Sequence, residues 1–153
     1  MAEKLQFELV SPEKLLLSEA VAMVVVPGSE GNFGVLPGHA LLISTVRPGV
    51  IDVYADEQTA VTERIFVSGG FAEVTPERCT VLADEALPIS ALDRAALEQQ
   101  QKSFEGAIAG LRDQVARLQG ADRDQAVLEL GAAERRLAVA AAKLAALQGA
   151  AAH

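Results

Sequence analysis

Four glycines and two prolines punctuate residues 27–40 of this chain. The runs on either side, Met23–Val26 and Leu41–Val46, are apolar and partly β-branched, which is typical of strands. Glycine adopts backbone conformations closed to other residues and proline fixes φ, so both mark places where a chain reverses. The pattern predicts a set of fixed turns between strands.

Short alternating runs continue through the chain up to Pro88. Lys4–Val10 and Thr62–Val67 alternate apolar and polar residues. Further strands are expected at Leu15–Leu17, Ala20–Val26, Leu41–Val46, Val50–Tyr54, Ala72–Val74 and Thr80–Leu82. About eight or more strands without intervening helical spacing predict an antiparallel β-sandwich or flattened barrel over residues 1–87.

The hydrophobic period changes near Pro88, where a second domain, 88–153, is expected to begin. Ser90 with Asp93 three residues later resembles a helix-capping box. Helical spacing follows at Leu92, Ala96, Phe104, Ile108, Leu111, Val115 and Leu118. After the break at Gln119–Asp122, a second helix is predicted. Along one of its sides lie Val127, Leu130, Leu137, Leu144 and Leu147, with Ala133, Ala140 and Ala141 beside them to allow close helix packing. The two helices should form an antiparallel hairpin.

Charge is distributed unequally between these halves. Residues 1–88 carry 13 acidic and 5 basic side chains, whereas residues 89–153 carry 8 of each. An acidic β half repels phosphate backbones and anionic lipid, so nucleic-acid binding is not expected. Residues 1–6 lack the apolar stretch of a signal peptide, which predicts a cytosolic protein.

The residues do not assemble a recognisable catalytic or metal site. The chain has one cysteine, Cys79, and two histidines, His39 and His153. His39 follows a Pro-Gly turn and is predicted to serve a turn or an interface rather than to act as a general base. The glycine-rich segment lacks the lysine and Ser/Thr of a phosphate-binding loop. These patterns favour architecture or recognition over catalysis, with no cofactor and no metal.

Together with Arg47–Ile51 and Val67–Val74, the segment 27–40 closely resembles the epsilon subunit family of bacterial F-type ATP synthases, in register from Leu5 to Ala86. The resemblance implies a ten-stranded β-sandwich followed by two helices. It implies a non-catalytic rotor subunit of the central stalk, which couples proton or sodium flow through the membrane ring to ATP synthesis. It also implies a peripheral location at the cytoplasmic face of the bacterial inner membrane.

The same resemblance implies partners and contact residues. Ser29, Glu30, Gly31 and Asn32 would lie near the polar loops of the c-ring, and His39 near the gamma subunit. The family's hairpin can fold against the sandwich or extend along gamma into the alpha/beta catalytic head, where it blocks ATP hydrolysis. We therefore expect residues 88–153 to be regulatory.

Some members of the family bind ATP on the hairpin through the pattern Ile-Asp, two residues, then Arg-Ala. This chain retains Ile89, Arg94 and Ala95, but has Ser90 in place of the aspartate and one extra residue before the arginine. One residue rotates a helical side chain by about 100°, so the departure argues against ATP binding. A second interpretation of the whole chain is a free-standing β-sandwich ligand-binding module with a helical appendage.

Overall fold

Residues 3–151 of the chain are described by a computed structural model. The chain divides into two compact units, Met1–Ala91 and Leu92–His153. Within the described residues, the first unit contains ten strands and a short 3-10 helix, and the second contains two long helices. This confirms the predicted fold class, a β-sandwich followed by a helical hairpin.

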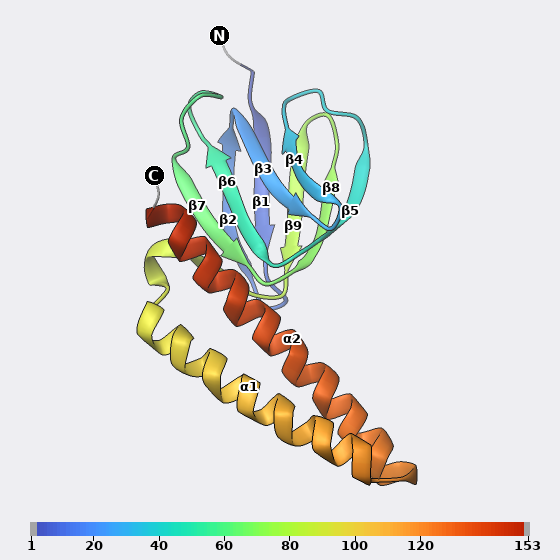
Figure 1. The fold of residues 1–153 in the computed structure, drawn as a ribbon. Helices are drawn as coiled ribbons and strands as arrows, with labels where there is room; N and C mark the ends of the chain where they lie inside the picture. The colour runs from blue at the N-terminus through green and yellow to red at the C-terminus, as the bar shows by residue number, and fades with distance from the viewer. Residues whose placement is uncertain (1–2, 152–153) are drawn as a thin grey trace. The chain divides into compact units, whose positions relative to one another are not determined.

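All ten strands belong to one sheet that folds over on itself (Figure 1). The strands are β1 (Leu5–Val10), β2 (Leu15–Val21), β3 (Met23–Gly28), β4 (Gly31–Val35), β5 (Leu42–Val46), β6 (Gly49–Tyr54), β7 (Glu63–Val67), β8 (Gly70–Val74), β9 (Arg78–Ala83) and β10 (Ala86–Pro88). Their order is β10-β7-β6-β3-β5-β8-β9-β1-β2, with β4 on the other side of β3. A single pairing, Gly28 with Val46, joins β3 to β5 where one layer passes into the other.

One pair of strands departs from the predicted antiparallel arrangement. β1 and β9 are parallel, with Phe7 opposite Cys79 and Leu9 opposite Val81, whereas the other pairs are antiparallel. Parallel neighbours require a long crossover connection. The strands between β1 and β9 provide it, so this pair closes one layer of the sandwich with segments far apart in the sequence.

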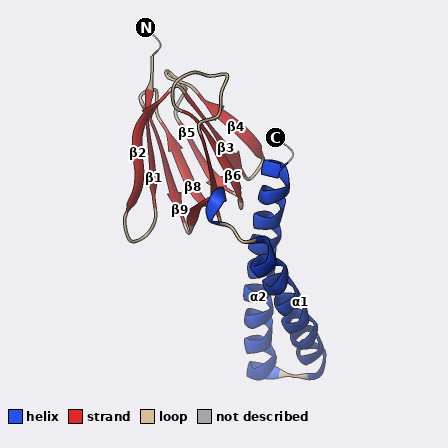
Figure 2. Cartoon of the chain, turned by 90° about the vertical axis from the view of Figure 1, so that its left-hand side faces the viewer, coloured by secondary structure: helices blue, strands red, loops and turns tan. Residues whose placement is uncertain are grey.

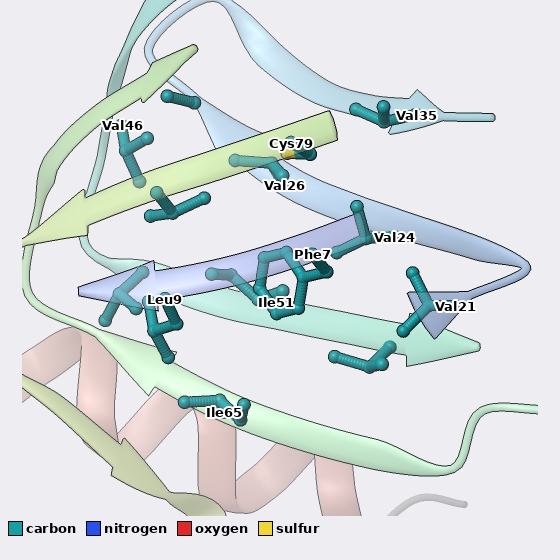
Figure 3. Packing of buried hydrophobic residues seen from close by; sticks show 14 of the residues in the cluster. Phe7, Leu9, Val21, Val24, Val26, Val35, Val46, Ile51, Ile65 and Cys79 are labelled. Carbon is teal, nitrogen blue, oxygen red and sulfur yellow. The ribbon is translucent and has the colours of Figure 1, made fainter. Parts of the chain in front are cut away.

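The core lies between the two layers and is built mainly from aliphatic side chains. In β1 the alternate residues Leu5, Phe7 and Leu9 are buried, as the period of two requires. Phe7 of β1 and Ile51 of β6 both belong to this core cluster (Figure 3). Burial also raises the pKa of the Cys79 thiol to about 12, so this cysteine is an inert core residue.

The segment predicted as a set of turns contains a strand. β3 continues to Gly28, β4 begins at Gly31, and only Ser29 and Glu30 lie between them. A Cβ at position 28 would lie 2.8 Å from the Gly31 carbonyl oxygen and 2.9 Å from the Phe33 ring, so this hairpin requires glycine there. The turn prediction is therefore correct at Ser29–Glu30 and at Pro37–Gly38, and wrong for β4, which lies between them.

The first unit also extends beyond the expected boundary at Leu87. β10 pairs Ala86, Leu87 and Pro88 with Val67, Phe66 and Ile65 of β7. The 3-10 helix Ile89–Ala91 follows and belongs to the same unit. The proline lies at the end of an edge strand, a position that does not need its missing N–H.

The second unit is an antiparallel pair of helices, α1 (Arg94–Arg117) and α2 (Gly120–Ala151) (Figure 2). Asp93 caps α1, because its carboxylate accepts hydrogen bonds from the N–H groups of Ala95 and Ala96 at 3.0 and 3.3 Å. Ser90, the predicted cap, lies instead in the 3-10 helix. The acidic residue of the expected capping box is thus itself the cap.

Small residues form the seam between these two helices. Ile108 of α1 is buried, as predicted, together with Ala126, Ala133 and Ala140 of α2, which recur every seven residues. Val127, predicted on the packed side of α2, is exposed. A seven-residue repeat of alanine places the helix backbones close together but buries little apolar area, so each contact contributes little to stability.

Candidate functional site

The tight β3–β4 turn presents the four residues predicted to contact a partner. Ser29 and Glu30 form the tip, Gly31 and Asn32 begin β4, and all four are exposed. Gly31 has a φ of 137°, a conformation that residues with a side chain rarely adopt. The sequence therefore located a real surface feature, which the two glycines at positions 28 and 31 shape.

The end of β5 holds this turn in place. The Ser29 amide donates to the Thr45 carbonyl at 3.0 Å, and the Thr45 hydroxyl donates to the Ser29 hydroxyl at 2.6 Å. The Arg47 guanidinium donates to the Gly28 carbonyl and, at 2.6 Å, to the Asn32 side-chain oxygen. Sequence reasoning missed these partners, because β5 lies 15 or more residues away along the chain.

Glu30 differs from its neighbours in this turn. Ser29 and Asn32 use their side chains within the fold, whereas the Glu30 carboxylate makes no hydrogen bond or ion pair with the residues that the structure describes. We call Ser29–Asn32, held in place by Thr45 and Arg47, the braced turn. The carboxylate at its tip is available to bind a donor or a cation on another molecule.

His39 lies at the other end of β4, in the loop that joins β4 to β5. Its Nδ1 is 2.7 Å from the Ala40 carbonyl oxygen, and its backbone N–H donates to the Leu36 carbonyl at 3.1 Å. β4 has five residues, about 15 Å of strand. The structure therefore separates His39 from the Glu30 turn, and the two belong to different parts of the surface.

An exposed apolar row crosses the outer face of β8, β9, β1 and β2, and sequence reasoning missed it. Phe71 lies opposite Leu82, Leu82 opposite Val10, and Val10 opposite Leu15. Phe71, Leu82 and Leu15 are 57%, 52% and 55% exposed. The alternation in Gly70–Val74, with Ala72 and Val74 buried, was a signal that Phe71 faces outward.

The apolar row reaches the braced turn. Thr45 lies directly opposite Phe71 in the pairing of β5 with β8, and the same threonine donates to Ser29. The first unit thus presents an apolar row that ends beside the turn of Glu30, whose carboxylate has no partner among the described residues. Such a combination, an apolar centre with a charged edge, is typical of protein interfaces.

The remnant of the nucleotide pattern lies where the first unit ends and α1 begins. Ile89 and Ser90 belong to the 3-10 helix, and Arg94 and Ala95 to the first turn of α1. Arg94 is exposed. Asp93, the carboxylate next to it, is occupied by capping the helix.

In the part of the chain that the structure describes, no three His, Cys, Asp or Glu side chains lie close enough to hold a metal ion. The described helices include none with the length and apolar character of a membrane span.

Comparisons with known proteins agree with this architecture. Residues 4–89 match the family model described as ATP synthase, Delta/Epsilon chain, beta-sandwich domain. The ATP synthase epsilon chain of Rhodospirillum centenum (strain ATCC 51521 / SW) is 58% identical over 147 residues, which are 94% of this chain and 92% of that protein. This chain belongs to the ATP synthase epsilon-chain family. Its predicted family is confirmed, and membership makes it a non-catalytic subunit rather than a free-standing ligand-binding module.

Two further relatives extend the comparison. The ATP synthase epsilon chain of Rhodospirillum rubrum is 62% identical over 97 residues, which are 63% of this chain and 71% of that protein. A chain in the solved mitochondrial ATP synthase of Euglena gracilis superposes with a TM-score of 0.61 at 23% identity, covering 98% of this epsilon chain and 82% of that one. The superposition with the Euglena gracilis chain shows the same fold at low sequence identity.

Proposed function

We propose that this epsilon chain is the rotor subunit of the central stalk and joins the c-ring to the gamma subunit at the cytoplasmic face of a bacterial inner membrane. The observation that carries the proposal is the braced turn, which holds the Glu30 carboxylate outward without a partner in the described structure. In this proposal the turn from Ser29 to Asn32 meets the polar loops of the c-ring. Ion flow through the ring then turns the stalk and drives ATP synthesis in the catalytic head.

The apolar row gives the proposal a second contact surface. A sheet face with Phe71 and Leu82 more than half exposed is stabilised when another protein covers it. In the proposed assembly gamma covers this row, beside the turn that meets the ring. His39, on the loop after β4, is proposed as a separate contact with gamma.

The hairpin is proposed to regulate ATP hydrolysis by extending into the alpha/beta catalytic head. Its seam of Ala126, Ala133 and Ala140 buries little apolar area, which keeps the cost of rearranging the helices low. We propose that it works without bound ATP, since Ser90 replaces the pattern's aspartate and Asp93 is occupied as the cap of α1.

Replacing Glu30 with lysine tests the ring contact. Reversing this charge should weaken binding of the full chain to a gamma–c-ring subcomplex by about tenfold, since a favourable charge pair becomes repulsive. Binding would be measured by biolayer interferometry at two salt concentrations, and the melting temperature of the isolated chain should stay unchanged.

The matched control is Glu57→Lys, which makes the same charge change in the exposed loop between β6 and β7. It should leave the affinity within about twofold of wild type, because long-range charge effects are screened at physiological salt. An unfolded Glu30→Lys chain, or one that bound as tightly as the control, would contradict the proposed contact.

A further inference from the structure

Arg47 holds the Glu30 turn from both sides. One guanidinium nitrogen donates to the carbonyl of Gly28, the last residue of β3, and the other donates to the side-chain oxygen of Asn32 in β4. The three residues between these acceptors are Ser29, Glu30 and Gly31. A single side chain thus bridges the two strands of the hairpin just below its tip.

The arginine is itself anchored by backbone contacts. Its N–H donates to the Pro27 carbonyl at 2.9 Å, and the residue before it, Val46, is buried and paired with Gly28. The guanidinium therefore projects from a fixed point at the end of β5. Two donors in one rigid plane define the orientation of the turn in a way that a lysine ammonium, a single point charge, cannot reproduce.

The turn needs this support because its own residues are conformationally permissive. Gly28 and Gly31 flank a two-residue tip, and glycine loses more backbone entropy than other residues when it is ordered. Without a brace, the Glu30 carboxylate would sample many directions. Ordering the tip before binding removes that entropic cost from the binding step.

We infer that Arg47 is a positioning residue, which fixes the direction of the Glu30 carboxylate for the partner without contacting that partner itself. The inference rests on the proposed function, since it supposes that Glu30 makes a contact. It predicts that the two-point geometry of the guanidinium, and not its charge, sets the affinity.

The experiment compares Arg47→Lys with wild type in the full chain bound to a gamma–c-ring subcomplex. Lysine keeps the positive charge but lacks the planar guanidinium that donates from two nitrogens. The affinity should therefore fall by about fivefold, because the tip is no longer ordered before binding. Arg64→Lys is the matched control, because Arg64 pairs with Asp52 on β6, away from the turn. The control should leave the affinity unchanged.

Nuclear magnetic resonance of the isolated chain separates positioning from general stability. In Arg47→Lys the amide signals of Glu30 and Gly31 should show increased fast motion, while those of the β1 core residues stay as in wild type. In the isolated chain, Asn32→Ala, which removes the other half of the bridge, should reproduce the increased motion of Glu30 and Gly31. It provides the test even if Arg47→Lys folds poorly.

A double-mutant cycle with Glu30→Gln decides whether Arg47 acts through Glu30. If it does, Arg47→Lys should change the affinity of the Glu30→Gln chain by less than about twofold. An equal loss in both backgrounds would overturn the positioning role, as would a loss in Glu30→Gln with none in Arg47→Lys. If Glu30→Gln bound as tightly as wild type, the proposed contact would fail and the positioning role would fail with it.

Discussion

At the scale of single residues, the negative charge of Glu19 lowers the stability of the folded chain. This glutamate lies on β2, and burial raises the pKa of its carboxyl, with the negative charges of Glu63 and Asp56 adding to the shift and Lys4 opposing it. The folded state therefore binds this proton more tightly than the unfolded chain does. The associated stability is fully present below 4.5, the ordinary pKa of this carboxyl group, and is lost as the pH rises through its raised pKa in the folded state.

Glu19→Gln should therefore stabilise the isolated chain at neutral pH. The free energy of unfolding should rise by a few tenths of a kcal/mol, a small effect because solvent screens a partly exposed group. The gain should shrink as the pH falls toward 4.5. Urea unfolding of both chains at pH 7 and pH 4 measures it, with Glu57→Gln as a control in an exposed loop. A larger gain at pH 4 than at pH 7 would show that the sign is wrong.

The candidate site was only partly predictable at this scale. The turn from Ser29 to Asn32 could be located because glycine and proline signal turns locally. Strand register across the sheet determines which residues at the end of β5 form hydrogen bonds with this turn, as Arg47 and Thr45 do. It also determines which side chains meet in the apolar row. Register is decided by packing between distant segments, so one sequence does not reveal it.

At the scale of elements, the strands and helices with a clear period were predicted correctly. β4 was missed because Gly31, Asn32 and Gly34 disfavour strands; pairing with β3 and burial of Val35 make it one. β10 was missed because it has only three residues and ends in proline. On α2, Ala133 and Ala140 are buried as predicted, whereas Val127, predicted on the same packed side, is exposed.

The cap of α1 provides a test at the element scale. Asp93→Ala should lower the stability of the helical unit by about 1 kcal/mol, because two N–H groups of the first turn lose their acceptor. Ser90→Ala is the matched control and should change it by much less, since Ser90 precedes the helix. Thermal unfolding followed by circular dichroism at 222 nm measures both. Equal losses, or a greater loss in Ser90→Ala, would restore Ser90 as the cap.

At the scale of the whole molecule, the change of period near Pro88 correctly indicated two different kinds of structure. The boundary in the structure falls after Ala91, because β10 and the 3-10 helix belong with the sandwich. The sequence could not show this, since a three-residue edge strand has no period of its own. The boundary determines which fragment should fold and assemble without the hairpin.

A chain ending at Ala91 should keep a cooperative unfolding transition and still bind the gamma–c-ring subcomplex, because the core cluster lies within Leu5–Ala83 with Ala86 packed against it. A chain ending at Leu87 lacks the pairing of Pro88 with Ile65 and should be less stable, by about 1 kcal/mol. Urea unfolding and binding measurements compare both with the full chain.

If the proposed regulation is correct, the enzyme assembled with the shorter chains should hydrolyse ATP faster. Failure of the Ala91 chain to fold or to bind would mean that the helices complete the rotor-binding unit, and the division into an assembly unit and a regulatory unit would be wrong.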